Sequence, residues 1–195
     1  MSYRDAHPIG ATSKSEWATS DDFRRLFIDD MNNLYLLSFL LTANHEEAER
    51  CFVAGLADCV DGNPIFKEWA SAWARGVIVR NAIRIIDPHV GPARLAGSAP
   101  ANEGNIRWTP LQDVPFASVL ALEDFERFVY VLSILERYPD QTCAVLLGTS
   151  IEDILETRNR ALEHIAEFAN REHARQRSRC HPGRECISQE AALTG

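Results

Sequence analysis

The sequence lacks a continuous apolar run of the roughly 18 to 20 residues that a membrane-spanning helix needs. Its most apolar stretch, Leu34–Leu41, has two asparagines just before it and Asn44 and His45 just after it. Residues 1–20 also lack the basic start and apolar core of a secretory signal peptide, because they mix charged residues with small ones and a proline. We therefore predict a cytoplasmic protein with no membrane segment.

Motifs of catalysis and of metal binding are also missing. HExxH, a glycine-rich phosphate loop, GxSxG and a locally supported Cys/His pair do not occur. The run His45-Glu46-Glu47 has no second histidine to complete a metal site on one helix face. Cys180, His181 and Cys186, even with His164 or His173 added, do not match the spacing of a closed zinc site. We expect neither catalysis nor a bound cofactor or metal.

The cysteines and the net charge further limit the class of protein that this sequence can encode. The five cysteines are an odd number without CxxC spacing, which fits reduced thiols in the cytosol better than a disulfide framework: Cys51, Cys59, Cys143, Cys180 and Cys186. The formal net charge of −8 argues against a general nucleic-acid coat, because nonspecific DNA affinity comes from clustered Lys and Arg. Any contact with DNA must be local or assisted by a partner.

Helical periodicity in the first half predicts one compact domain. With 46% apolar residues, the 195-residue chain can form one large core or two small ones. Apolar residues recur at helical spacing from Asp21 to Ile86, with breaks at Thr42–Asn44 and at Asp61–Pro64. This pattern predicts three or four short antiparallel helices within residues 21–87, after a flexible segment at 1–20.

The second half predicts a linker and a helix-turn-helix. Residues 88–115 hold five prolines and three glycines with little periodicity, which is typical of a linker. A second domain over 116–170 combines an amphipathic series, a short helix to Leu147, a turn at Gly148 and a long helix from about Ile151 to Ala169. We predict an all-α protein that ends in a flexible, Arg-rich tail at 171–195.

Two stretches of the first domain resemble a known family. Leu34–Thr42, followed by Glu46–Glu49, is similar to an apolar helix, its Leu-Thr stop and the acidic start of the next helix in region 2 of sigma factors. Phe66–Trp69 with Trp73–Asn81 is similar to the family's pattern of aromatics followed by an apolar-Ala-Arg-Asn stretch, and this match is the more specific one. The family is the sigma-70 superfamily, in its extracytoplasmic-function type.

The second domain resembles region 4 of the same family. Phe128–Leu132, Ala144–Ile151, Ile154 and Arg160–Ala161 follow its helix-turn-helix pattern, and the resemblance covers about residues 21–168. It implies a dissociable subunit of bacterial RNA polymerase that directs promoter recognition and transcription initiation. The first domain would grip the polymerase clamp and open the −10 element, and the last helix would enter the major groove of the −35 element. The implied partners are core RNA polymerase, promoter DNA and an anti-sigma factor.

Three sets of site residues follow from the resemblance. The candidates for holding melted −10 DNA are aromatic, Arg and Asn side chains: Trp69, Trp73, Arg75, Arg80, Asn81 and Arg84. The candidates for the −35 element are expected to face outward on the last helix: Ser150, Glu152, Asp153, Glu156, Thr157, Arg158 and Arg160. Ile151, Ile154 and Ala161 are expected to face inward. The candidates for polymerase contact are Glu46, Glu49 and Arg50.

The chain also departs from the family, which leaves an alternative open. The family usually carries Lys or Arg where this sequence has Leu155–Thr157, and Cys51–Ala54 replaces its Leu-Val-Gln-Glu run. Trp69 and Trp73 can also be read as core aromatics, and the arginines as a solvated helix face. The alternative is a sigma-like interaction protein that binds polymerase or a regulator without promoter-specific initiation.

Overall fold

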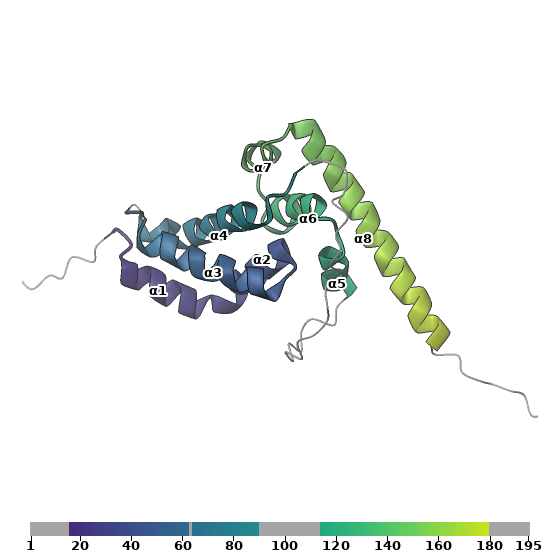
Figure 1. Cartoon of the computed structure of the whole chain (residues 1–195), viewed down its shortest axis with the longest axis horizontal. Helices are drawn as coiled ribbons and strands as arrows, with labels where there is room; N and C mark the ends of the chain where they lie inside the picture. The colour runs from purple at the N-terminus through teal and green to yellow at the C-terminus, as the bar shows by residue number, and fades with distance from the viewer. Residues whose placement is uncertain (1–15, 63, 90–113, 180–195) are drawn as a thin grey trace, which may run out of the picture. The chain divides into compact units, whose positions relative to one another are not determined.

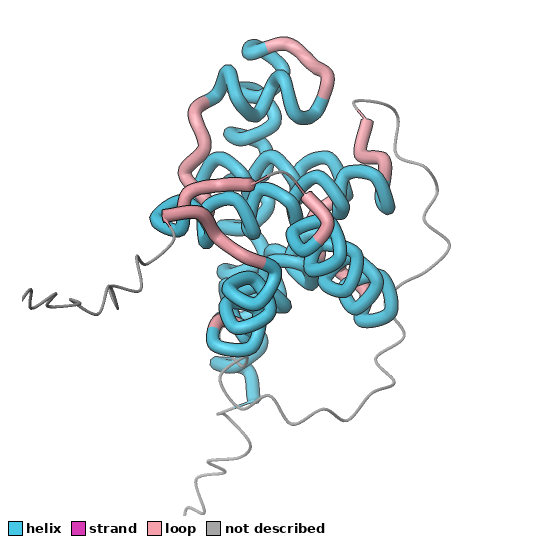
Figure 2. Tube along the Cα trace, turned by 90° about the vertical axis from the view of Figure 1, so that its left-hand side faces the viewer, coloured by secondary structure: helices cyan, strands magenta, loops and turns pink. Residues whose placement is uncertain are grey.

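The computed structural model describes residues 16–62, 64–89 and 114–179 of the chain. Within these ranges the regular structure is helical, which confirms the all-α prediction, and the one β contact is an isolated bridge between Trp17 and Phe66 (Figure 2). The chain divides into two compact units, residues Met1–Asp87 and Pro88–Gly195. None of the helices in the described ranges is both long enough and apolar enough to cross a membrane.

Unit 1 is a bundle of α-helices with one short 3-10 helix. The elements are α1 (Ser20–Asp29), α2 (Met31–Thr42), α3 (His45–Val60), η1 (Lys67–Trp69) and α4 (Ala70–Ile86) (Figure 1). Helix α3 packs against α1, α2 and α4. The largest fully buried side chains of the unit are apolar or thiol groups: Leu34, Leu41, Cys51, Ile78 and Val79.

The helix ends of unit 1 follow from short-range chemistry. Asn44 begins α3 by accepting hydrogen bonds from the backbone N–H groups of Glu46 and Glu47, and Ala43 before it is left-handed at φ 52°. Gly55 lets α3 approach α4 closely, because a Cβ at this position would lie 3.0 Å from Cγ1 of Ile78. These features produce the short antiparallel helices that the sequence predicts.

Unit 2 is built around a long helix. Its elements are α5 (Val114–Leu120), α6 (Asp124–Tyr130), the π-helical η2 (Val131–Leu135), α7 (Asp140–Leu147) and α8 (Ile151–Arg179). Helix α8 packs against α5, α6 and α7. Gly148 ends α7 in the left-handed conformation at φ 64°, and Asp153 accepts hydrogen bonds from Thr149 and Ser150 at the start of α8. This turn joins α7 to α8 at the position where the sequence predicts a turn between two helices.

Two features of unit 2 differ from the sequence expectation. Helix α5 was not predicted; its Pro115 is the second residue, where the missing N–H costs no helical bond. Helix α8 continues to Arg179, although the sequence was expected to become a flexible tail from residue 171. The expectation was wrong for 171–179 because no Gly or Pro interrupts this stretch and Arg175 pairs with Glu172 one turn earlier at 2.6 Å. The rest of the tail, most of the linker and residues 1–15 lie outside the described residues.

Candidate nucleic-acid interface

Three aromatic rings form an exposed cluster at the start of α4, which we call the aromatic platform: Trp17, Phe66 and Trp69. The rings of Trp17 and Phe66 stack with their centroids 4.2 Å apart, and Phe66 meets Trp69 edge-on at 5.3 Å. Trp17 is 47% exposed and Trp69 is 54% exposed. Most Trp surface is buried in folded proteins, so rings as exposed as these are unusual. Their exposed area can be covered by a ligand.

The backbone holds the platform in place from two sides. The N–H of Ala18 donates to the carbonyl of Ile65 at 2.7 Å, and the N–H of Lys67 donates to the carbonyl of Glu16 at 2.9 Å. The ammonium group of Lys67 lies 3.1 Å from the carboxylate of Asp22 in α1. The segment before α1 is therefore tied to the start of α4, and the platform does not depend on side-chain stacking alone.

Asp22 has a second role at the N-terminus of α1. It forms a capping box with Thr19, whose backbone N–H and hydroxyl both donate to its carboxylate. These hydrogen bonds, with Lys67 adding a smaller effect, lower the pKa of Asp22 from 3.8 to about 2. The carboxylate is thus ionised, and available to Lys67, at any pH above the acid range.

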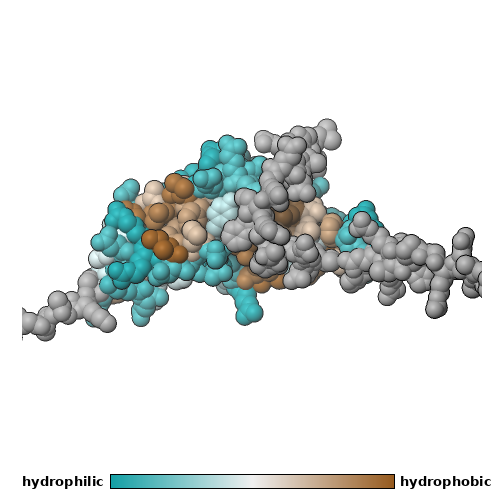
Figure 3. All heavy atoms as spheres, turned by 90° about the horizontal axis from the view of Figure 1, so that it is seen from below, coloured by the Kyte–Doolittle hydropathy of each residue, from teal (hydrophilic) through white to brown (hydrophobic). Residues whose placement is uncertain are grey.

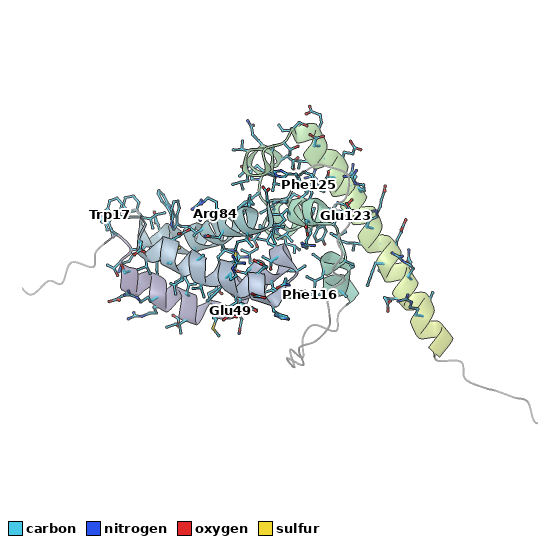
Figure 4. All side chains as sticks on the ribbon, viewed as in Figure 1. Trp17, Glu49, Arg84, Phe116, Glu123 and Phe125 are labelled. Atoms are coloured by element: carbon cyan, nitrogen blue, oxygen red, sulfur yellow. The ribbon has the colours of Figure 1, made fainter. Side chains whose placement is uncertain are left out.

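The exposed face of α4 continues from the platform toward the C-terminus of the helix. Trp69, Trp73, Arg80 and Arg84 follow one another at spacings of four, seven and four residues, which places them on one helix face. The guanidinium of Arg80 lies 4.8 Å from the centre of the Trp73 ring, as in a cation–π pair. Figure 4 labels Trp17 and Arg84, which lie on the α4 side of unit 1.

Trp73 packs into unit 1 and also forms part of the exposed face of α4. Its side chain is half-buried, and in the described structure its indole Nε1 is a buried polar atom without a hydrogen-bond partner. The ring therefore packs with one edge and carries Arg80 on its face. Because Arg80 itself is exposed, this contact holds its guanidinium in a defined position at the surface.

Asn81 was expected to contact DNA, and the structure buries its side chain. Its side chain is 2% exposed, and its amide donates to the Asp58 carboxylate at 2.9 Å and to the Val77 carbonyl at 3.0 Å. Both bonds are donated by the amide nitrogen, and the one to Asp58 ties α4 to α3. Asp58 also lies 3.7 Å from Arg84, whose side chain remains 69% exposed. Arg75, also a candidate, is half-buried.

The residues expected to contact polymerase lie on the exposed side of α3. Glu46, Glu49 and Arg50 are all exposed, and Arg50 pairs with Glu47 at 2.9 Å. Nearby, burial raises the pKa of Tyr35, with the carboxylate of Glu49 adding to the shift. The surface here is therefore acidic and partly aromatic.

Apolar side chains also reach the surface of unit 1. Ile28 is 74% exposed, Met31 is 52% exposed and Val53 is 59% exposed. Figure 3 shows apolar residues among hydrophilic ones on the lower side of this unit as drawn in Figure 1. Val53 belongs to the run that replaces the family's polar residues on α3, so the surface expected to meet polymerase is apolar at this position.

On α8 the structure brings only part of the expected outward set to the surface. Ser150, Glu152 and Glu156 are exposed. Thr157 was expected to face outward and is 2% exposed, while Ile151 was expected to face inward and is 39% exposed. Both expectations were wrong, because the helices that pack against α8 meet it on the side of Ile154, Thr157 and Ala161.

The charged candidates on α8 are occupied by contacts within unit 2. Arg158 pairs with Asp140 of α7 at 2.5 Å, and Arg160 donates from Nε to Glu126 of α6 at 2.8 Å. Asp153 accepts from Thr149 and Ser150, and these bonds lower its pKa. The two cations of the expected recognition surface therefore already have carboxylate partners, which reduces the charge they can offer to phosphates.

Sequence reasoning missed Trp17, because its role depends on a bridge to a residue 49 positions away. Its only sequence signal is a lone Trp in a polar segment. Within the part of the chain that the structure describes, no three His, Cys, Asp or Glu side chains gather closely enough to hold a metal ion.

No protein-family model matches the sequence, and no curated protein matches it as a relative. The chain is similar to a chain in the co-crystal structure of the sigma factor RpoE in complex with the anti-sigma factor NepR from Bartonella quintana. The sequences are 18% identical, the TM-score is 0.44, and the match covers 77% of this chain and 98% of that chain.

Proposed function

We propose that this protein is a sigma-type transcription initiation factor, in which unit 1 binds core RNA polymerase and holds unpaired bases of the −10 element. The observation that carries the proposal is the aromatic platform, continued along α4 by Trp73, Arg80 and Arg84. The stretches that resemble sigma region 2 include two of the platform's rings. Base stacking and a row of arginines are what melted DNA requires of a protein surface.

The exposed rings of this surface would contribute stacking energy in favour of a single-stranded state. Each base stacked on an aromatic side chain contributes about 1–3 kcal/mol. Two exposed rings, Trp17 and Trp69, would therefore contribute roughly 2–6 kcal/mol toward holding open DNA. With a net charge of −8 the protein does not concentrate DNA by itself, so core polymerase would have to bring the promoter to this surface.

The polymerase-contact residues, unit 2 and an anti-sigma factor have supporting roles in this proposal. Glu46, Glu49 and Arg50 would contribute polar contacts to polymerase, beside the exposed Val53. Unit 2 would act as an added anchor rather than as the main reader of sequence, because Arg158 and Arg160 are paired with carboxylates. An anti-sigma factor would act by covering one of these surfaces. The protein itself would carry out no chemistry.

A sigma-like interaction protein is the second candidate. The observation in its favour is the exposed pair Glu152 and Glu156 at the start of α8, where a major-groove reader needs donors and cations. Such a protein would bind polymerase or a regulator without directing initiation from particular promoters.

The test combines binding and transcription. The purified protein is used to capture bacterial core RNA polymerase, and the complex is then assayed by run-off transcription on a promoter library. We expect promoter-specific transcripts with the parent and with Trp69→Phe, which keeps a stacking ring. We expect transcripts to fall at least tenfold with Trp69→Ala or Arg80→Ala, about the loss of one stacked base.

The outcomes separate the candidates. Polymerase capture with specific transcripts that Trp69→Ala abolishes supports the sigma function. Capture without transcripts favours the interaction protein. A protein that does not capture polymerase, although correctly folded by circular dichroism, would contradict the sigma function and leave only an interaction protein that binds a regulator.

A further inference from the structure

Helix α8 carries a stripe of apolar side chains that its own unit does not cover. Ile151 is 39% exposed, Leu155 is 39% exposed and Leu162 is 43% exposed. Together with Arg158 they follow a spacing of four, three and four residues, so they align along one helix face. The face buried in unit 2 is a different one, marked by Ile154, Thr157 and Ala161. We call the first set the apolar stripe of α8.

A column of carboxylates runs beside the stripe. Glu152, Glu156 and Glu163 are each one position further along the helix than a member of the stripe, and Glu167 extends the column. All four side chains are exposed, and none forms an ion pair with another residue among those that the structure describes. The stripe and the column together make a surface that is apolar along its centre and negative along one side.

The apolar centre and the negative side of this surface together indicate which kind of partner it can bind. A DNA backbone would be repelled by the carboxylates and would leave the leucines without apolar contact. A second copy of the chain would bring a carboxylate column of its own, on a protein whose net charge is −8. An amphipathic helix with an apolar face and basic flanks satisfies both parts of the surface, in the helix-against-groove manner of many regulatory complexes.

We propose that this face of α8 is a docking surface for a basic amphipathic helix of another protein, and not a surface that enters a DNA groove. Ile151, Leu155 and Leu162 supply the apolar contact. Glu152, Glu156 and Glu163 select Lys or Arg on the partner helix and fix its direction. The proposal does not rest on what unit 1 binds, so it holds for a sigma factor and for a sigma-like interaction protein alike.

The ion pair of Arg158 limits the effect of its positive charge on the apolar stripe. Arg158 lies within the stripe and would interrupt it with a positive charge, but its guanidinium is drawn to Asp140 of α7 at 2.5 Å. The pair neutralises the arginine at the α7 edge of the stripe. The negative side of the surface is thereby confined to the opposite, carboxylate edge.

The probe is a synthetic helical peptide with leucines at its a and d positions and lysines elsewhere, labelled with fluorescein. Its counterpart has glutamate in place of every lysine, and a labelled DNA duplex serves as the third probe. Binding to the full chain is followed by fluorescence anisotropy. Hydrogen–deuterium exchange then locates the protected amides.

Four variants test the surface residue by residue. Leu155→Ala removes part of the stripe, and Glu156→Lys reverses one charge of the column. Ile28→Ala and Asp29→Lys likewise remove an apolar side chain and reverse a charge, at exposed positions of α1 in unit 1. All four side chains are exposed, so the fold should tolerate the substitutions.

The expected result is binding of the lysine peptide and not of its glutamate counterpart, with protection over 151–163. Leu155→Ala should weaken binding roughly threefold to sevenfold, because about two-fifths of a leucine side chain becomes buried in the complex. Glu156→Lys should weaken it about tenfold, and the unit 1 changes should alter it less than about twofold.

Three results would overturn the proposal. Equal losses from Asp29→Lys and Glu156→Lys would mean that the acidic protein attracts the peptide by net charge alone. Failure of the parent to bind the lysine peptide would remove the docking surface. Binding of the DNA duplex that Leu155→Ala or Glu156→Lys alters would place this face in a DNA groove instead.

Discussion

Glu126 is the most deeply buried carboxylate among the described residues of unit 2, and its contacts allow a quantitative prediction. Its side chain is 5% exposed; it accepts a hydrogen bond from Nε of Arg160 at 2.8 Å and lies 2.9 Å from Nδ1 of His164. The contacts join α6 to α8. Because a buried charge without a partner is costly, the two half-exposed residues of α8 should matter chiefly through the carboxylate that they cover.

The perturbation is the double variant Arg160→Ala with His164→Ala. It leaves the Glu126 carboxylate without either partner. Removing the partners of a buried charge costs about 3–5 kcal/mol. We expect the lower end, about 3 kcal/mol, because Arg160 and His164 are 46% and 50% exposed and their loss admits water. Adding Glu126→Gln to the double variant should restore about 1–2 kcal/mol, since a neutral amide is cheaper to bury.

The assay is urea unfolding of the full chain, read by hydrogen exchange in peptides of α6 and α8. Peptides of unit 1 serve as the internal control and should not change. The reasoning fails if the double variant loses less stability than Glu126→Gln alone. It also fails if Glu126→Gln lowers the stability of the double variant further, because the buried charge would then not be the source of the loss.

Three further predictions concern pH, thiols and a turn. The pKa of Asp22, lowered to about 2 in the folded protein, means that its contribution to stability is full above pH 3.8 and is lost as the pH falls toward 2; carboxyl NMR titration measures this directly. Burial raises the pKa of Cys51 to about 11 and of Cys59 to about 12, so iodoacetamide at pH 8 should modify both only after urea is added, as mass spectrometry would show. Rapid labelling of either in the native protein would contradict their burial. Gly148→Ala should cost about 1 kcal/mol in urea unfolding, because φ is +64° there although nothing crowds the added methyl group; an unchanged midpoint would count against this strain.

Local chemistry made much of the fold predictable. Asn44 before two glutamates predicts where α3 begins, and Gly148 predicts where α7 ends, because capping and left-handed turns depend on a few neighbouring residues. The end of α8 was misplaced because Arg-rich polarity was taken for a tail. The absence of Gly and Pro before residue 180 was the better signal.

The site was less predictable, because its decisive contacts join residues far apart in the sequence. The bridge from Trp17 to Phe66 and the hydrogen bond from Asn81 to Asp58 depend on how α4 packs against the elements before it. On α8, apolar residues occupy two faces, and only the packing of α5, α6 and α7 decides which face is buried. For this reason Thr157 was predicted to face outward and Ile151 to face inward, the reverse of their places in the structure.

The measurement that most directly tests the proposed role of the aromatic platform is permanganate footprinting of a promoter bound by core polymerase and this protein. Permanganate oxidises unpaired thymines, so it reports DNA opening base by base. We predict reactive thymines in the −10 element with the parent and with Trp69→Phe, and their loss with Trp17→Ala combined with Trp69→Ala. Undiminished reactivity with that double variant, or a closed −10 element in the complex with the parent, would contradict the account.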